Sequence, residues 1–254
     1  MAGEVMQKPL VDLAVGHTVR RYDEELANLR GIILDMGHRV IEQTQAALTA
    51  LIDGDESLAY RVLDREPQID YLSLDADEEI FRVIARRQPT AVDLRIVLAL
   101  SRTAGDVERA GDKTVRIARQ SLVLRESGLE QGALHSEPLA ALLRALHDQA
   151  CCMFERAIQA IATFDVELAL GVFEDEPKLF DASDETRAFL GREDLAGFQP
   201  RQIVALLTCA HALERIGNHA SNIAEQVIYV AEGKDIRYRN REILIETLRR
   251  GRTI

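Results

Sequence analysis

The sequence predicts an all-α protein built from two tandem, pseudo-symmetric three-helix bundles. Apolar residues recur at steps of three and four along most of the chain, which is the spacing of one helix face, and the period-two alternation of a half-buried strand is absent. The pattern of the first half recurs in the second half, as in proteins made of repeated units. A chain of 254 residues is also long enough for two bundles, each with its own core.

The first predicted helix has its apolar seam between residues 26 and 50, followed by the turn residues Asp53, Gly54 and Asp55. The seam residues fall at alternating steps of three and four, as expected for a helix in a bundle. They are Leu26, Leu29, Ile33, Met36, Val40, Gln43, Ala47 and Ala50.

A second helical stripe covers residues 58–83, and a third helix follows it. Pro67 interrupts the second stripe, and we expect it to restart or kink the helix, because proline lacks an amide hydrogen and clashes with the preceding turn. Pro89 marks the start of the third helix, which extends to about Ser121. Three helices therefore fill residues 20–122.

Two runs of matched residues show that this unit occurs twice. With an offset of 110 residues, Asp55, Leu58, Ala59, Val62, Glu66 and Pro67 match Asp165, Leu168, Ala169, Val172, Glu176 and Pro177. With an offset of 106 residues, Arg95, Ala99, Leu100, Ala104, Glu108, Arg109, Gly111, Ile117 and Ala118 match Arg201, Ala205, Leu206, Ala210, Glu214, Arg215, Gly217, Ile223 and Ala224. Because both runs occur in the same order, we infer an internal duplication.

We place the first repeat at residues 17–125, the second repeat at 137–233, and a basic C-terminal tail at 234–254. The tail has seven Lys or Arg residues against three acids. Four large apolar residues stand among its arginines: Ile243, Leu244, Ile245 and Leu248. We hypothesise that the tail docks on an acidic surface of a partner or of a second subunit, and a frayed, solvated terminus is the alternative.

The composition argues against several classes of function. A formal net charge of −11 opposes approach to nucleic acid or to an anionic bilayer, so cationic partners or metal ions fit better. The sequence has no charge-free run of about eighteen residues for a membrane span and no secretory signal. We therefore expect a cytoplasmic protein that binds no nucleic acid and has no membrane span.

Two carboxylate pairs in the first repeat have the i, i+4 spacing that places both side chains on one helix face: Glu66 with Asp70, and Glu108 with Asp112. The pairs occupy like positions beside the seams of two antiparallel helices, so we expect all four acids to lie together. Clustered carboxylates repel one another, and a cation would offset this repulsion. Hard oxygen donors suit Mg, Mn, Ca or iron.

A solvated charged face is the simpler interpretation of the same four acids. Three basic residues stand near them in the sequence and could pair with them: Arg65, Arg109 and Lys113.

The second repeat keeps only part of this acidic pattern. Glu176 and Glu214 are present, but Phe180 and Asn218 stand where the two aspartates would be. We therefore expect any metal site in the second repeat to be degraded.

No motif in the sequence indicates catalysis. A dinuclear carboxylate oxidase of the ferritin-like type needs Glu-x-x-His twice, and the sequence has none. A Gly-x-Ser-x-Gly elbow, a Walker phosphate loop and a dinucleotide fingerprint are also absent from it. We therefore expect a non-enzymatic regulatory scaffold. The alternatives are a helical-bundle carboxylate metalloprotein, for metal storage or oxidation, and a purely structural helical protein.

Three runs of residues carry a family resemblance. They are Ala85-Arg86-Arg87-Gln88-Pro89 with Asp93-Leu94-Arg95, then Glu108-Arg109-Ala110-Gly111-Asp112, and finally the run from Leu213 to Glu225 that contains Glu214-Arg215-Ile216-Gly217-Asn218. In combination they resemble the PhoU family of phosphate-uptake regulators, over roughly residues 17–237. The Glu-Arg-x-Gly signature follows a long helix in both halves, and each half carries the earlier Asp-x-x-Leu-Ala signature.

The resemblance implies two three-helix bundles, no catalysis, and metal held by Glu or Asp-x-x-x-Asp motifs. The metal-binding residues that it implies are Glu66, Asp70, Glu108 and Asp112, with Glu176 and Glu214 as a partial second motif. The metal expected on this basis is a divalent ion or multinuclear cluster of Fe, Mn, Mg or Zn, and its identity stays open.

The resemblance also implies a function and partners. Members of the family link the ATPase of the phosphate ABC transporter to a membrane sensor histidine kinase. They act as negative regulators, which hold the phosphate-starvation response off when phosphate is plentiful. We therefore expect a cytoplasmic homodimer that regulates phosphate homeostasis and reaches the inner membrane through these partners.

Overall fold

The computed structural model describes residues 20–135, 138–192, 198–237 and 239–251. In these ranges the chain is helical and has no strand, which confirms the all-α prediction. The helices are α1 (Arg20–Asp53), α2 (Glu56–Arg87), α3 (Ala91–Glu126), α4 (Pro138–Thr163), α5 (Val166–Leu190), α6 (Pro200–Glu232) and α7 (Arg241–Arg249). Residues 17–19 of the first predicted repeat, 137 and 193–197 of the second, and 238 and 252–254 of the tail lie outside the described residues.

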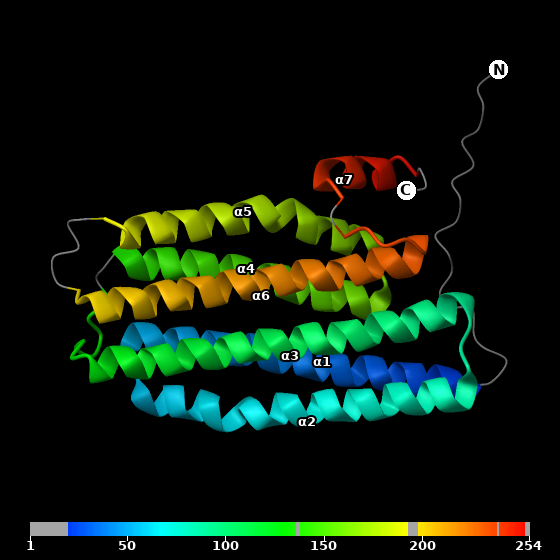
Figure 1. Ribbon diagram of the computed structural model, residues 1–254, viewed down its shortest axis with the longest axis horizontal. Coiled ribbons are helices and arrows are strands. Elements are labelled where there is room, and N and C mark those ends of the chain that lie inside the picture. The colour runs from blue at the N-terminus through cyan, green and yellow to red at the C-terminus, as the bar shows by residue number, and fades with distance from the viewer. Residues whose placement is uncertain (1–19, 136–137, 193–197, 238, 252–254) are drawn as a thin grey trace, which may run out of the picture.

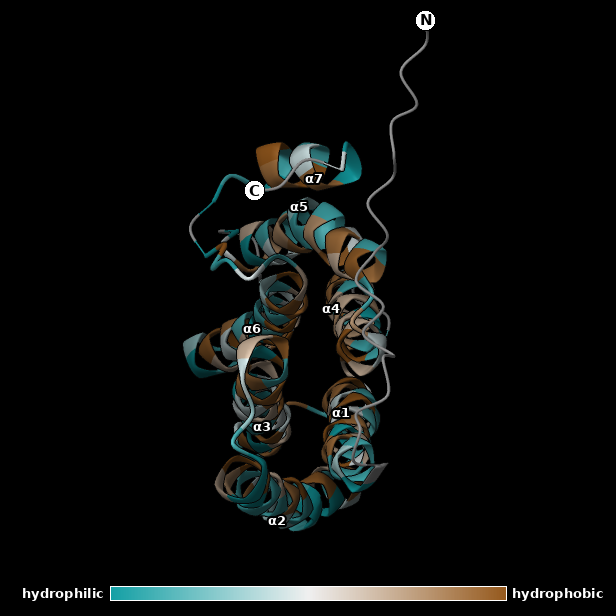
Figure 2. Cartoon of the chain, turned by 90° about the vertical axis from the view of Figure 1, so that its right-hand side faces the viewer, coloured by the Kyte–Doolittle hydropathy of each residue, from teal (hydrophilic) through white to brown (hydrophobic). Residues whose placement is uncertain are grey.

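The six long helices form two three-helix units that lie side by side (Figure 1). Helices α1, α2 and α3 form the first unit, and α4, α5 and α6 form the second, with α3 packed on α6 and α1 on α4. Seen end-on in Figure 2, the helices turn their hydrophobic sides toward a common interior. The buried apolar side chains of both units therefore join in one continuous core. None of the described helices is long and apolar enough to cross a membrane.

The turn between the first two helices is built alike in both repeats. Asp55 Oδ1 accepts a hydrogen bond from Leu58 N at 2.9 Å, and Asp165 Oδ1 accepts one from Leu168 N at 3.0 Å. The residue before each aspartate is left-handed, with φ of 64° at Gly54 and 53° at Phe164. This conformation is costly for phenylalanine, and burial of the Phe164 ring in the core offsets the cost.

Pro67 and Pro177 lie inside α2 and α5 and do not end them. Each proline removes one backbone hydrogen bond, and Figure 1 shows both helices bending part-way along their length. Of the two outcomes predicted for Pro67, the structure shows a bend and no restart. Glu66 and Asp70 consequently belong to one continuous helix, one turn apart.

The third helix of each repeat approaches the second helix closely at a glycine. A Cβ atom added at Gly111 would lie 3.2 Å from Ile69 Cδ1, and one added at Gly217 would lie 2.9 Å from Leu179 Cδ1. The two glycines match each other in the duplication, as do Ile69 and Leu179. The close approach of a neighbouring side chain, and not backbone conformation, therefore favours glycine at both positions.

A buried polar cluster joins the two repeats. Asp106 of α3 accepts hydrogen bonds from His219 Nδ1 at 2.9 Å and from Asn222 Nδ2 at 3.0 Å, both on α6, and from Arg109 Nη2 at 2.9 Å. Burial would raise the pKa of Asp106, but the hydrogen bonds from His219, Arg109 and Asn222 outweigh it and lower the pKa. The ionised carboxylate is thus the form that holds α3 against α6.

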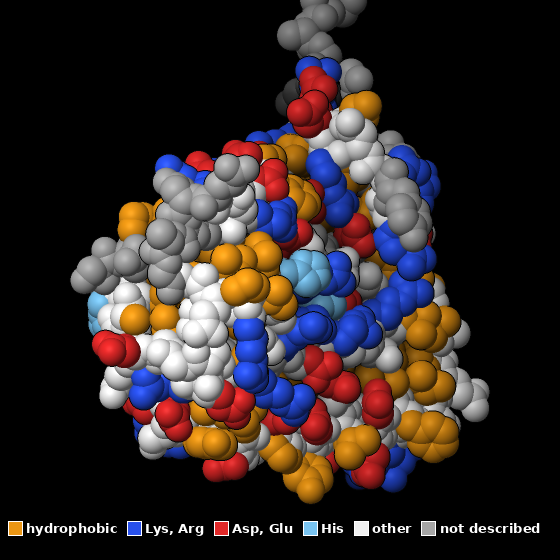
Figure 3. Space-filling view, turned by 60° about the vertical axis from the view of Figure 1, so that its left-hand side comes forward, with side chains coloured by type: hydrophobic (Ala, Val, Ile, Leu, Met, Phe, Trp, Pro, Cys, Tyr) orange, Lys and Arg blue, Asp and Glu red, His pale blue; other side chains and the backbone are white. Residues whose placement is uncertain are grey.

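Helix α2 carries an apolar stripe on its outer side. Tyr60, Tyr71, Leu74 and Phe81 are each more than half exposed, and their spacings of eleven, three and seven residues place them on one helix face. Figure 3 shows hydrophobic side chains along the lower edge of the molecule, which α2 forms in Figure 1. Such a patch is typical of a surface that contacts another protein.

The C-terminal tail folds back on the second repeat. Its helix α7 lies against α5 (Figure 1), with Leu244 buried and Arg249 Nη1 2.7 Å from Glu174 Oε1. The acidic residue that Arg249 contacts belongs to the chain's own second repeat. Docking of the tail on a partner or on a second subunit stays a prediction. The alternative of a frayed terminus does not hold for residues 241–249, which form a helix.

Substitution of Gly217, where α6 packs closely against α5, should reduce stability. Gly217→Ala forces a methyl group against Leu179, and we expect it to lower the free energy of unfolding by about 1 to 2 kcal/mol, net of the higher helix propensity of alanine. Gly31→Ala is the matched control, since an added Cβ there meets nothing within 4 Å, and it should stabilise by up to about 1 kcal/mol. Urea unfolding measures both, and equal changes would contradict the packing account.

Asp106 should make the junction of the repeats sensitive to acid. Because its pKa is lowered on folding, Asp106 stabilises the protein above the ordinary carboxyl pKa and ceases to do so as pH falls through its folded value. Asp106→Asn should lower the free energy of unfolding by about 1.5 to 3 kcal/mol at pH 7, and this difference from the wild type should shrink below about pH 4. Urea unfolding at both pH values checks this, with the exposed Asp181→Asn as control. A difference that persists in acid would contradict it.

Candidate functional site

The structure brings the four acids of the first repeat together. Glu66 and Asp70 of α2, and Glu108 and Asp112 of α3, line one pocket. Their meeting follows from the close approach of the two helices at Gly111, which lines the same pocket. The predicted juxtaposition of these four side chains is therefore what the structure shows.

The acids are not electrostatically equivalent. Asp70 is an exposed residue, but partial desolvation and then the charges of Glu108 and Asp112 raise the pKa of its carboxyl. Glu108 accepts a hydrogen bond from Ser73 Oγ at 2.7 Å. The ionised form of Asp70 is thus disfavoured by desolvation and by the two neighbouring carboxylates.

Gln43 of α1 also lines the pocket. Its side chain is buried, and its Nε2 donates to the carbonyl of Arg65 at 3.4 Å. Its Oε1 is buried and has no hydrogen-bond partner among the described residues. An unpartnered buried oxygen is costly unless a positive or donating group comes to it.

Basic residues near the acids in sequence do not all pair with them. Arg109 donates to Asp106 at the junction of the repeats. Arg119 Nη2 lies 3.8 Å from Glu66 Oε2, and the exposed fraction of the arginine side chain is 63%, so this pair is weak. These two arginines therefore do not neutralise the charges around Asp70.

The donor set fits a hard cation by its chemistry. Four carboxylates and one amide face the pocket, so every donor is oxygen, and the repulsion around Asp70 is what a cation would relieve. The side chains are not converged, because within the described ranges no three His, Cys, Asp or Glu side chains are placed to ligate one ion. Cation binding would require the carboxylates to turn toward one another.

The second repeat does not fit a cation. Glu214 accepts hydrogen bonds from Ser183 Oγ at 2.6 Å and from Arg187 Nη1. Burial would raise the pKa of Glu214, but these two donors outweigh it and lower the pKa. An arginine therefore supplies the positive charge that a metal would supply.

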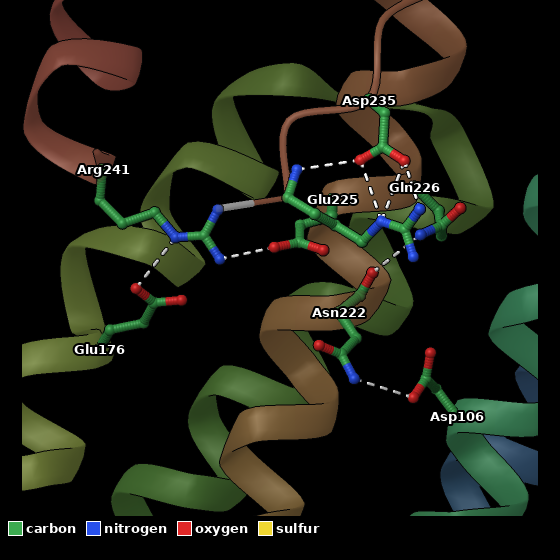
Figure 4. Close-up of polar contacts among 8 residues, drawn as sticks. Asp106, Glu176, Asn222, Glu225, Gln226, Asp235 and Arg241 are labelled. Atoms are coloured by element: carbon green, nitrogen blue, oxygen red, sulfur yellow. Dashed lines mark hydrogen bonds and ion pairs between the residues drawn. The ribbon is translucent and has the colours of Figure 1, made fainter. Parts of the chain in front are cut away.

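Glu176 is likewise occupied by an arginine. Its Oε2 accepts a hydrogen bond from Arg241 Nε at 3.2 Å (Figure 4). Phe180, at the position of Asp70, is nearly half exposed, and Asn218 stands at the position of Asp112. The two glutamates predicted as a partial metal motif are thus separate ion pairs.

Some of these contacts left a signal in the sequence. Gln43 is a polar residue in an otherwise apolar seam, which marks a buried polar group. Ser73 and Ser183 match in the duplication, and both donate to the glutamate of the Glu-Arg-x-Gly signature. The pairing of Glu176 with Arg241 had no such signal, because it joins the repeat to the tail.

The comparisons with known proteins identify the family. The PhoU domain matches the chain twice, over residues 33–121 and 143–227, and these two segments lie one in each repeat. This chain therefore belongs to the PhoU family. Relatives in this family are named accessory proteins of the phosphate-specific transport system, which is a name for a transport accessory and not for an enzyme.

Individual relatives align over most of the chain. The "Phosphate-specific transport system accessory protein PhoU homolog" of Pseudomonas putida is 36% identical over 228 residues, which cover 87% of this chain and 85% of the relative. The accessory protein PhoU of Escherichia coli (strain K12) is 30% identical over 227 residues, which cover 87% of this chain and 90% of the relative.

Solved structures share the fold. The crystal structure of PhoU from Pseudomonas aeruginosa has a TM-score of 0.75 and 35% identity, and covers 84% of this chain and 100% of that one. The phosphate transport system regulatory protein PhoU from Streptococcus pneumoniae has a TM-score of 0.74 at 21% identity, over 84% of this chain and 98% of that one. The second likeness concerns the fold alone.

Proposed function

We propose that this protein is a non-enzymatic regulator of phosphate uptake and phosphate-starvation signalling. The match of the PhoU domain to both repeats carries this proposal. Relatives that align with most of the chain are named accessory proteins of the phosphate-specific transport system. The protein then acts by contact with other proteins and performs no reaction of its own.

Its proposed partners are the ATPase of the phosphate ABC transporter and a sensor histidine kinase. In this scheme the protein, as a homodimer, couples the two and represses the starvation response when phosphate is plentiful. The apolar stripe of α2 supports a role through protein contacts, because four large side chains there are more than half exposed. The matched positions of α5 include Asp181 and Asp184, so the two repeats present different surfaces.

Deletion of the gene tests the regulatory role. In high-phosphate medium the deletion strain should show raised alkaline phosphatase activity, since a repressor of the starvation response is missing. Expression of the wild-type chain should restore low activity. Activity that stays low after deletion, and rises normally on phosphate starvation, would refute the proposal.

We further propose that the four-acid pocket of the first repeat binds a divalent or multinuclear metal centre, and that the second repeat binds none. The all-oxygen lining, the raised pKa of Asp70 and the unpartnered oxygen of Gln43 support the first part. The arginines on Glu176 and Glu214 support the second. A bound metal would supply positive charge and tie α2 to α3.

Metal content tests this assignment. The purified protein should contain divalent metal, and Glu108→Gln combined with Asp112→Asn should remove most of it, because two of the four carboxylates are lost. Asp64→Asn with Asp75→Asn removes the same charge from exposed positions of α2 and should leave the metal content unchanged. Elemental analysis measures all three proteins. Equal metal content in the site variant and the wild type would remove the assignment.

A carboxylate metalloprotein for metal storage or oxidation is the second candidate, and the four-acid pocket is the observation that favours it. The missing Glu-x-x-His pairs argue against it. Redox turnover of the metal-loaded protein, together with normal phosphatase regulation in the deletion strain, would favour this candidate over the regulator.

A further inference from the structure

Arg241, the first residue of α7, places its guanidinium against α5 and α6 of the second repeat. Its Nε donates to Glu176 Oε2 at 3.2 Å, its Nη2 donates to Glu225 Oε1 at 2.7 Å, and its Cζ lies 4.2 Å from the centre of the Phe173 ring. Figure 4 shows Arg241 reaching from α7 to one carboxylate on α5 and another on α6. We call Phe173, Glu176 and Glu225 the guanidinium site.

The two carboxylates of this site need a positive charge. Their side chains are only 16% and 9% exposed for Glu176 and Glu225. The pKa of Glu225 is raised chiefly by burial, with Glu176 adding to the rise and Arg241 opposing it. Without a guanidinium, two buried like charges would face each other, and breaking such a buried pairing is strongly destabilising. Carboxylates and an aromatic face are also the partners that a guanidinium prefers.

The first repeat lacks this site. Glu66 matches Glu176, but Arg119 stands at the position that Glu225 occupies in the second repeat. Arg119 lies 3.8 Å from Glu66, so that repeat brings its positive charge from its own third helix. Leu63 matches Phe173, so the aromatic face is absent as well. The second repeat therefore has a site whose cation must come from outside the three-helix unit.

The helix that now fills the site is held by few contacts besides Arg241. Helix α7 is nine residues long, Leu244 is buried, and Ile245 and Leu248 are partly buried against the core, whereas Ile243 is 66% exposed. Arg249 pairs with Glu174 and with Glu167, but all three side chains are more than 40% exposed, and such surface pairs contribute little. A helix this short is marginal in water by itself. Its position consequently depends on Arg241 and on these apolar residues.

We propose that the guanidinium site is a docking site for an arginine carried on an amphipathic helix. In the free protein α7 fills it, and an arginine-bearing helix of a partner protein takes the place of α7. The short connection between α6 and α7 gives the tethered helix an effective concentration in the millimolar range, so a partner helix must bind more tightly than α7 does. The proposal goes beyond the phosphate role and does not depend on it.

Hydrogen exchange in the full-length protein tests whether Arg241 stabilises α7 in its docked position. Arg241→Ala should speed amide exchange in residues 242–249 by about tenfold or more, because charge-assisted hydrogen bonds to buried acids are lost. Arg250→Ala is the matched control, since Arg250 pairs with the exposed Glu246 one turn earlier, and it should leave exchange unchanged. Unchanged exchange in Arg241→Ala would overturn the proposal.

Binding in trans tests the docking site itself. A fluorescent peptide of residues 239–251 should bind full-length Arg241→Ala, whose site is vacated, and should bind the wild type at least about tenfold more weakly because α7 competes. Glu225→Arg added to Arg241→Ala recreates the arrangement of Glu66 with Arg119 and should abolish binding of the peptide. Fluorescence anisotropy measures each affinity. Absence of binding to Arg241→Ala, or equal binding to the double variant, would overturn the proposal.

A milder substitution distinguishes loss of the docking site from a folding defect of the double variant. Glu176→Gln in the Arg241→Ala background keeps the size of the side chain and removes one of the two charges. It should weaken peptide binding by about tenfold while circular dichroism and the unfolding midpoint stay near those of Arg241→Ala. Full affinity in this variant would overturn the proposal even if Glu225→Arg unfolds the protein.

Discussion

The close packing of the second and third helices in each repeat is the constraint on which the rest of the structure depends. A glycine on the third helix lets the second helix approach, and the glutamate one turn before that glycine is thereby held against a serine of the second helix. Glu108 with Ser73, and Glu214 with Ser183, repeat this contact. A carboxylate held between two helices loses part of its hydration, and this loss must be compensated by hydrogen bonds or by a nearby positive charge.

The two repeats meet this requirement differently. The first repeat gathers more acids around its glutamate and leaves the pKa of Asp70 raised. The second replaces the aspartates and brings an arginine to each glutamate, Arg187 from α5 and Arg241 from α7. The duplication is thus preserved in the order of the helices, the turns and the close contacts, while the charges have diverged. Because of that divergence, the first repeat has a pocket lined by four acids, whereas the corresponding glutamates of the second repeat pair with arginines.

The fold could be predicted from sequence because its causes are local or periodic. Apolar spacing defines helix faces, and the two matched runs reveal the duplication before any contact is known. The four-acid pocket followed from the same periodicity. Contacts between elements far apart had no such basis: Asp106 and His219 are 113 residues apart, and Arg241 and Glu176 are 65 residues apart. Neither pair lies at matched positions of the repeat, so only the packed structure brings them together. The bend at Pro67 likewise needed the structure, since packing decides between a kink and a break.

The arginines of the second repeat supply its counter-charges from the polypeptide itself and not from the surrounding solution. A charge that belongs to the polypeptide is present in fixed proportion under every ionic condition, and neither dilution nor a chelator can withdraw it. The counter-charges of the second repeat are therefore independent of the supply of metal. The metal proposed for the first repeat would give that half a charge that follows the supply of cations. On that proposal, one molecule contains an invariant reference and a responsive element, joined along a shared core.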